Sequence, residues 1–111
     1  MKKWPKELWA LGRRYQVRYV SDTKYIKDDD GDELVAQVSF WRRVIRVGLK
    51  THGVRRTKED IFLDMMHEMM HVIIEDDSAI KKIVGNHVEE FVTRFSKYLA
   101  DILLRNGFVR L

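Results

Sequence analysis

The motif HEMMH at residues 67–71 lies inside an apolar run from Ile61 to Ile74 and constrains the fold of this chain more than any other stretch. An α-helix turns once in about 3.6 residues, so histidines four positions apart lie one above the other on the same face. Their imidazoles can share one cation, and Glu68 projects beside them as a proton acceptor. This pattern is typical of a helix that binds Zn²⁺ through two histidines and carries a general base.

The residues around the motif predict a helix from Lys58 to Glu75. Thr57 can cap its N-terminus, and Asp60 stands at the third helical position, which is a variant of the capping box. Around the helical wheel, apolar residues cover most of the circumference and the polar side chains form one strip. The strip consists of Asp60, Asp64, His67, Glu68, His71 and Glu75. Because the strip holds acids and histidines but no Lys or Arg, a metal site is favoured over a solvated stripe.

The composition predicts a single folded domain over residues 1–111. Hydrophobic residues make up 45% and aromatic residues 11% of the chain, which argues against disorder. There is no cysteine, so histidines and carboxylates must supply any metal ligands. No run approaches the roughly 18 apolar residues of a membrane span, and no signal-peptide core follows the first residues. We therefore expect a cytoplasmic protein that has no membrane contact.

Positive charge is concentrated in two segments, at residues 2–18 and 42–58, although the net charge is only +4 at pH 7. Their cations are Lys2, Lys3, Lys6, Arg13, Arg14, Arg18, Arg42, Arg43, Arg46, Lys50, Arg55, Arg56 and Lys58. Such clusters can attract nucleic acid or an acidic protein, or can simply keep a protein soluble.

Alternation of apolar and polar residues predicts a small antiparallel sheet. Its expected strands are residues 8–11 and 15–20 around a turn, followed by a hairpin of 34–40 and 44–49. The expected fold class is α+β, with two N-terminal strands and the hairpin packed on the motif helix and on a C-terminal helix.

Two polar segments are predicted to be loops. The acidic segment 28–33 has glycine at its fourth position, and Ser39 stands where the twelfth residue of a calcium-binding loop must be glutamate. It is therefore expected to be solvated. In the segment 51–54, His52 is a possible further ligand, although a loop histidine beside glycine is more typically a free surface residue.

A short helix over residues 79–84 and a long C-terminal helix are predicted after the motif helix. Ser78 is expected to cap the first of them. Asn86, with Glu89 three residues later, forms a capping-box pattern before the last helix, which should end near Arg105. The expected core stripe of this last helix consists of Val88, Phe91, Val92, Phe95, Leu99, Ile102 and Leu103.

A catalytic zinc site needs a third protein ligand and an open position. The candidates are His87, Glu89 and Glu90, at the start of the last helix. On the wheel, Glu90 points away from the expected core stripe, whereas Glu89 and His87 fall on its two shoulders. Glu89 lies near Ser96 and Ala100, small residues that would let another helix approach closely. We therefore favour Glu89 as the third ligand and keep His87 as the alternative.

The motif and the order of the predicted elements resemble the compact zinc metallopeptidases called SprT-like and ImmA/IrrE-like, most of all their short stand-alone versions in bacteriophages and prophages. The resemblance covers about residues 9–106. Outside the motif it rests on the opening 89–92 and on Phe95, Ser96, Leu99, Leu103 and Asn106.

The two families differ in the third zinc ligand that they imply. An ImmA/IrrE-like glutamate, followed by aromatic and small residues, maps onto Glu89, Phe95 and Ser96. A SprT-like histidine, with phenylalanine four residues later, maps onto His87 and Phe91. Either resemblance implies a minimal zincin-like fold and a phage- or prophage-encoded, Zn²⁺-dependent peptidase that acts on a protein or peptide.

The resulting hypothesis is that His67, His71 and Glu89 (or His87) hold Zn²⁺ while Glu68 acts as the general base. Asp64, one turn earlier, could orient a histidine through its second ring nitrogen. Tyr98 and His52 are candidates for stabilising the oxyanion. The alternatives are a basic module that binds nucleic acid or protein and uses its metal only to brace the fold, and a metal hydrolase that is not a peptidase.

Overall fold

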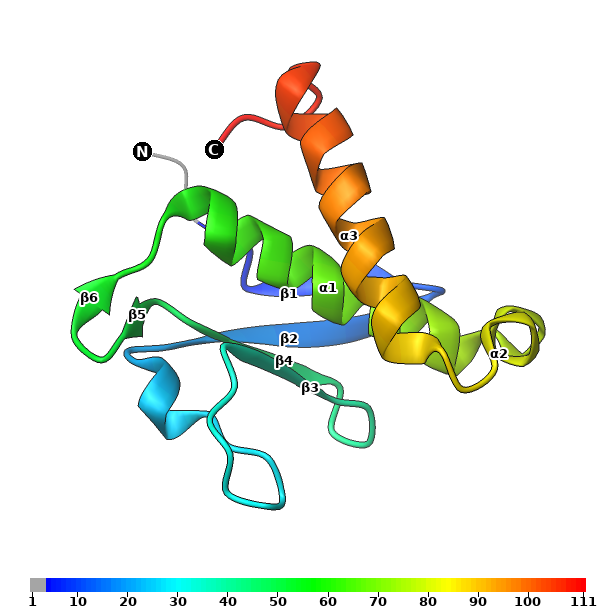
Figure 1. Ribbon diagram of the computed structural model, residues 1–111, viewed down its shortest axis with the longest axis horizontal. Coiled ribbons are helices and arrows are strands. Elements are labelled where there is room, and N and C mark those ends of the chain that lie inside the picture. The colour runs from blue at the N-terminus through cyan, green and yellow to red at the C-terminus, as the bar shows by residue number, and fades with distance from the viewer. Residues whose placement is uncertain (1–3) are drawn as a thin grey trace.

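The computed structural model describes residues 4–111, so Lys2 and Lys3 of the first basic segment lie outside it. The fold is α+β (Figure 1). Its strands are β1 (Glu7–Ala10), β2 (Arg13–Val20), β3 (Ala36–Ser39), β4 (Val44–Gly48), β5 (Lys50–Thr51) and β6 (Val54–Arg55). Its helices are the 3₁₀ turn η1 (Thr23–Tyr25), α1 (Lys58–Asp76), α2 (Ser78–Val84) and α3 (Val88–Arg105). Within the described residues, none of these helices has the length and apolar content needed to span a membrane.

The main sheet has the strand order β1-β2-β4-β3 and is mixed. The β1–β2 and β3–β4 pairs are antiparallel, which confirms the predicted hairpin. The expectation of a wholly antiparallel sheet is wrong, because β2 and β4 run parallel, with Val17 beside Ile45. After β2, the connection over residues 21–35 leaves the position next to β2 open, and β3 forms one strand position further along the sheet. β4 then takes the inner position, since Ile45 and Val47 are fully buried, and the more polar β3 is left at the edge.

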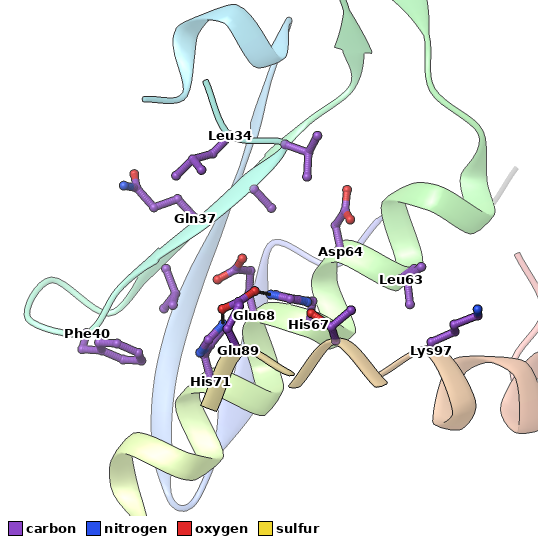
Figure 2. A pocket seen from close by; sticks show the side chains of 14 residues that line it. Leu34, Gln37, Phe40, Leu63, Asp64, His67, Glu68, His71, Glu89 and Lys97 are labelled. Carbon is purple, nitrogen blue, oxygen red and sulfur yellow. Dashed lines mark ion pairs between the residues drawn. The ribbon is translucent and has the colours of Figure 1, made fainter. Parts of the chain in front are cut away.

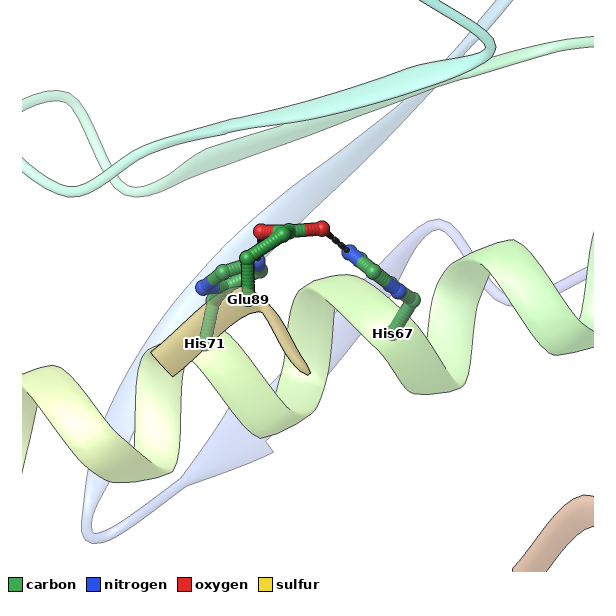
Figure 3. A group of neighbouring side chains, drawn as sticks. All are labelled: His67, His71 and Glu89. Atoms are coloured by element: carbon green, nitrogen blue, oxygen red, sulfur yellow. Dashed lines mark ion pairs between the residues drawn. The ribbon is translucent and has the colours of Figure 1, made fainter. Parts of the chain in front are cut away.

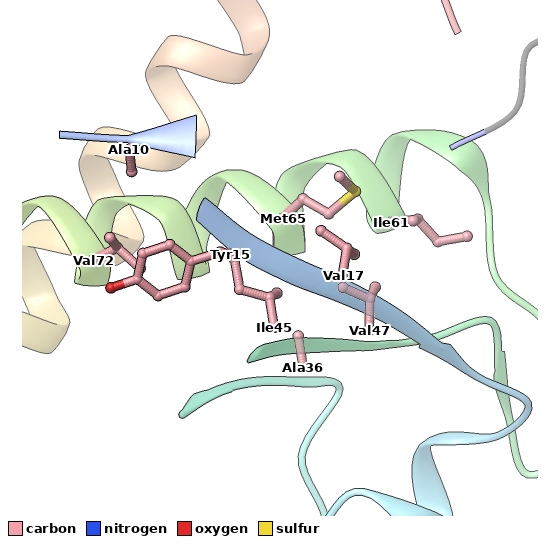
Figure 4. Close-up of a cluster of buried hydrophobic side chains, with 9 residues drawn as sticks. All are labelled: Ala10, Tyr15, Val17, Ala36, Ile45, Val47, Ile61, Met65 and Val72. Carbon is pink, nitrogen blue, oxygen red and sulfur yellow. The ribbon is translucent and has the colours of Figure 1, made fainter. Parts of the chain in front are cut away.

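The core fills the space between one face of the main sheet and α1 (Figure 4). Its buried side chains are Ala10, Tyr15, Val17, Ala36, Ile45, Val47, Ile61, Met65 and Val72. In β2, Tyr15 and Val17 point into this core, whereas Gln16 and Arg18 point to the opposite, solvent-exposed face. Burying each large apolar side chain contributes roughly 1.5–3 kcal/mol, so this layer holds α1 against the sheet.

The segment after β4 is a second small hairpin, although it was predicted to be a loop. β5 and β6 pair antiparallel, and His52 and Gly53 both adopt positive φ at the turn between them. The buried carboxylate of Asp22 accepts hydrogen bonds from the backbone N–H groups of His52 at 3.1 Å and Gly53 at 2.8 Å. Asp22 thereby fixes the turn.

The predicted ends of α1 agree with the structure to within one residue. The Thr57 hydroxyl accepts a hydrogen bond from the Asp60 N–H at 3.1 Å, which confirms Thr57 as the N-cap. The prediction that Ser78 caps α2 is wrong. The N-cap is Asp77, whose carboxylate accepts from the Ile80 N–H at 3.0 Å. Asp77 is the one residue between α1 and α2, so it ends the first helix and caps the second.

α3 departs furthest from expectation. Its N-cap is His87, which makes no side-chain capping hydrogen bond, so the predicted capping box of Asn86 and Glu89 is wrong. Its buried residues are Val92, Ser96 and Ala100, whereas Phe91, Phe95 and Ile102 of the predicted core stripe are exposed. Small side chains let two helix backbones approach closely, and α3 therefore packs on α1 through this small-residue face.

Candidate metal centre

The two histidines of the motif lie side by side on α1, on the side that meets α3 (Figure 3). Their ring centroids are 5.0 Å apart and the rings are inclined by 62°. Both rings turn Nε2 toward the first turn of α3. The helical spacing of four residues thus places both donor atoms on one side of α1, as the sequence predicts.

Glu89 completes the group from α3. Its Oε1 lies 2.9 Å from Nε2 of His67, and its Oε2 lies 2.9 Å from Nε2 of His71. One donor atom from each of the three residues fits within a span of 4.8 Å, so His67, His71 and Glu89 could hold a metal ion. Two imidazoles and one carboxylate are a donor set that Zn²⁺ uses in catalytic sites, where three protein ligands leave a fourth position for water.

The packing of α3 decides which predicted third ligand reaches the histidines. Val92 and Ser96 are fully buried against α1, and Glu89 lies one turn before Val92 on the same side of α3. His87 is exposed, and its Nδ1 lies 3.9 Å from a carboxylate oxygen of Glu90. The structure therefore brings Glu89 to His67 and His71, and His87 is not part of this group.

Glu68 is the buried carboxyl of the centre, with 7% of its surface exposed. Burial raises its pKa to about 7, with further contributions from the negative charges of Glu89 and Asp64, and a hydrogen bond from the backbone of Val38 opposes them. A group with a pKa near neutral can both accept and release a proton at cellular pH. Glu68 therefore has the properties of a general base.

Burial lowers the pKa of His71, and the negative charge of Glu89 opposes this shift. A lower pKa favours the neutral imidazole near pH 7. Neutral imidazole is the form that binds a metal ion.

The group lies in a cleft of about 650 Å³ between β3 and the two long helices (Figure 2). The β3 side contributes Leu34, Val35, Ala36, Gln37, Val38 and Phe40, and the helices contribute Leu63, Asp64, Thr93 and Lys97 in addition to the histidines and glutamates. The cleft is therefore mainly apolar with a polar floor. The backbone of Val38 also makes a hydrogen bond to Glu68, and no residue type in the sequence indicates such a backbone contact.

Asp64 does not have the partner that the sequence suggested. Its carboxylate pairs with the guanidinium of Arg56, which also donates to the backbone carbonyl of Gly48 at 2.9 Å. Burial raises the pKa of Asp64, and the charge of Arg56 opposes that shift. Asp64 thus ties the segment before α1 to the wall of the cleft, whereas the sequence suggested that it could orient a histidine.

Neither predicted oxyanion candidate lines the cleft. Tyr98 is exposed on α3. His52 lies in the turn between β5 and β6, and its Nε2 is 2.8 Å from a carboxylate oxygen of Glu33. His52 is likewise not part of the metal-binding group. It is exposed, as expected of a surface residue, but its ring pairs with Glu33 and is therefore not free.

No protein-family model, curated protein or solved structure matches the chain at a significant level. The resemblance to SprT-like and ImmA/IrrE-like enzymes therefore stays a prediction from the sequence. A function has to be inferred from the site itself.

Proposed function

We propose that this protein is a Zn²⁺-dependent metallopeptidase with a minimal zincin-like site. The observation that carries the proposal is the convergence of His67, His71 and Glu89 beside the buried carboxyl of Glu68. A structural zinc site closes its coordination with four protein ligands, whereas a catalytic site keeps one position open. Three donors at the wall of an open cleft fit the catalytic kind.

Zn²⁺ bound by His67, His71 and Glu89 would supply a Lewis acid that lowers the pKa of a water molecule and polarises a substrate carbonyl. Glu68 then takes the proton of the attacking water and passes it to the leaving amine. Its pKa is about 7 in the metal-free protein, and the Val38 backbone holds its carboxylate in place.

A peptide is the substrate that the cleft favours. β3 is the edge strand of the main sheet and also lines the cleft. An edge strand can pair through its backbone with an extended chain, which then lies beside the sheet as an added strand. Apolar side chains such as Val35, Phe40 and Leu63 line the same cleft and would accept apolar side chains of that peptide.

The test compares wild type with Glu68→Gln in two assays, hydrolysis of an unfolded protein such as casein and zinc content of the purified protein. We expect Glu68→Gln to lose hydrolysis and keep zinc, because the amide cannot accept the proton but leaves all three ligands intact. His67→Ala is the matched control and should lose both. Full activity of Glu68→Gln would refute the proposed mechanism, and joint loss of zinc and activity would give Glu68 a different role.

A second candidate function, nucleic-acid binding with a metal that only braces the fold, is favoured by the sheet face that points away from α1. Arg18 of β2 is the direct neighbour of Arg46 of β4 on this face, and Arg14 lies further along β2. Like charges side by side in a sheet cost stability unless an anion neutralises them. Binding through phosphate contacts would weaken steeply with rising salt and would survive Glu68→Gln. Absence of binding to DNA and RNA at low salt excludes this candidate.

A further inference from the structure

α3 carries an exposed apolar stripe, which the described part of the chain covers only in part. The stripe consists of Phe91, Phe95, Tyr98 and Ile102, which are 38%, 47%, 58% and 52% exposed. The rings of Phe91 and Phe95 stack, with centroids 5.3 Å apart. A contiguous apolar face on a soluble protein usually marks an interface.

The stripe is separate from the two other faces of α3, which pack on α1 and line the cleft. At 100° per residue it lies roughly a third of a turn from the buried face of Val92, Ser96 and Ala100. The cleft is lined from the other side of that buried face, by Glu89, Thr93 and Lys97. A partner on the stripe would therefore leave the metal centre open.

The spacing of the stripe is that of a coiled-coil seam. Its residues follow one another at intervals of four, three and four, which is the alternation of a and d positions in a heptad. In an antiparallel pair of such helices, a positions pack against d positions. Two copies of α3 fit this rule when Phe95 of each copy lies opposite Tyr98 of the other, and Phe91 opposite Ile102.

The charges beside the seam select the same register. Arg94 and Asp101 occupy the flanking g positions, and the antiparallel register puts Arg94 of one copy opposite Asp101 of the other, twice by symmetry. It also places Glu90 opposite Arg105. Within one copy these residues already form ion pairs, Arg94–Glu90 at 3.6 Å and Arg105–Asp101 at 2.7 Å. A parallel pair, in which g faces e, would instead bring Arg94 against Leu99 and Asp101 against Asn106, so neither charge would meet an opposite one.

We propose that this protein forms a two-fold dimer in which α3 pairs antiparallel with α3 of a second copy through the stripe. Self-complementary charge is what a two-fold interface requires, since residue i of each copy must suit residue j of the other. A membrane surface would call for a flank of uniformly basic residues, whereas this flank alternates in sign. The proposal concerns a face remote from the cleft and stands independently of the peptidase activity.

The first experiment measures molar mass by sedimentation over a wide concentration series. Wild type should have twice the chain mass at high concentration, and Phe95→Ser should be a monomer with an unchanged circular dichroism spectrum. The matched control is Trp41→Ser, which removes a side chain that is 96% exposed between β3 and β4 and should leave the dimer intact. A wild-type monomer at every concentration, or a dimer that Phe95→Ser does not weaken, would overturn the proposal.

The second experiment fixes the partner and its orientation by charge reversal. Arg94→Glu and Asp101→Arg should each weaken the dimer roughly tenfold, because each places like charges opposite one another twice. The double variant should regain most of the wild-type affinity, since the reversed pairs are again complementary. The circular dichroism spectrum serves as a control for folding in all three variants. If the double variant is as weak as the single ones, α3 does not pair with itself in this register.

Discussion

At the scale of single residues, Glu68 is placed where a carboxylate is costly. Its side chain is buried near two other acids, Asp64 and Glu89, and its pKa rises from 4.5 to about 7. In the metal-free folded protein Glu68 therefore keeps a proton between pH 4.5 and 7 that the unfolded chain has already lost. Acidification stabilises the state that binds more protons, which here is the folded state. The free energy of unfolding of the metal-free protein should therefore fall as pH rises through this window.

This reasoning predicts that Glu68→Gln stabilises the metal-free protein at alkaline pH. The amide is a neutral replacement for the protonated acid, so the expected gain at about pH 8 is on the order of 3 kcal/mol in the free energy of unfolding. Little gain is expected below pH 4.5, where the acid is protonated in both states. Urea unfolding of wild type and Glu68→Gln in the presence of chelator, at several pH values, measures this gain in the free energy of unfolding. A gain that does not depend on pH would show that the carboxyl is not held in its neutral form.

Single substitutions can also test whether Glu89 or His87 is the third metal ligand. Glu89→Ala should sharply reduce zinc content, because its carboxylate oxygens lie 2.9 Å from Nε2 of both histidines. His87→Ala should keep its zinc, and Glu90→Ala provides a matched control for removing an acid from the same turn. Zinc stoichiometry of the three purified variants is the measurement. Loss of zinc from His87→Ala with retention in Glu89→Ala would reverse the assignment.

At the scale of elements, local sequence patterns predicted α1 and its N-cap. They did not predict the contacts between segments that are distant in the sequence. The Thr57 cap and the apolar run lie within the helix that they define, so the sequence located α1 to within one residue. The position of β4 between β2 and β3 depends on pairing across the sheet, which no local pattern encodes. In α3, large aromatic residues dominated the wheel, although small residues make the contact with α1. The preference for Glu89 rested on those same small residues.

The small-residue face of α3 should therefore be sensitive to size. Ser96 is fully buried, and within the described residues its hydroxyl has no hydrogen-bond partner. Ser96→Leu should overpack the contact with α1, lower the free energy of unfolding by roughly 1–3 kcal/mol and weaken zinc binding, because Glu89 is carried away from the histidines. Thermal unfolding and zinc titration measure both effects.

Ser96→Ala is the matched control for this substitution. It removes a buried hydroxyl that lacks a partner, so it should leave zinc affinity unchanged and stability equal or higher. Equal zinc affinity in the Leu and Ala variants would mean that the approach of α3 does not position Glu89.

At the scale of the whole molecule, three surfaces separate three kinds of chemistry. The cleft gathers acids and histidines, the sheet face away from α1 gathers arginines, and the outer side of α3 gathers aromatic residues. The motif made the first surface predictable, because its spacing alone fixes two donors and a base on one helix. The edge strand along the cleft and the exposure of the stripe on α3 depend on the tertiary arrangement. The helical period of the stripe is visible in the sequence, but it predicted a core face.

The central claim is that His67, His71 and Glu89 bind a metal ion, and the most direct test is elemental analysis of native protein purified without chelator. We expect one zinc ion per chain, removable by chelator, restored by added zinc, and absent from His67→Ala. Native wild-type protein that contains no metal and takes up no added zinc would contradict the account, and the metallopeptidase proposal would then be withdrawn.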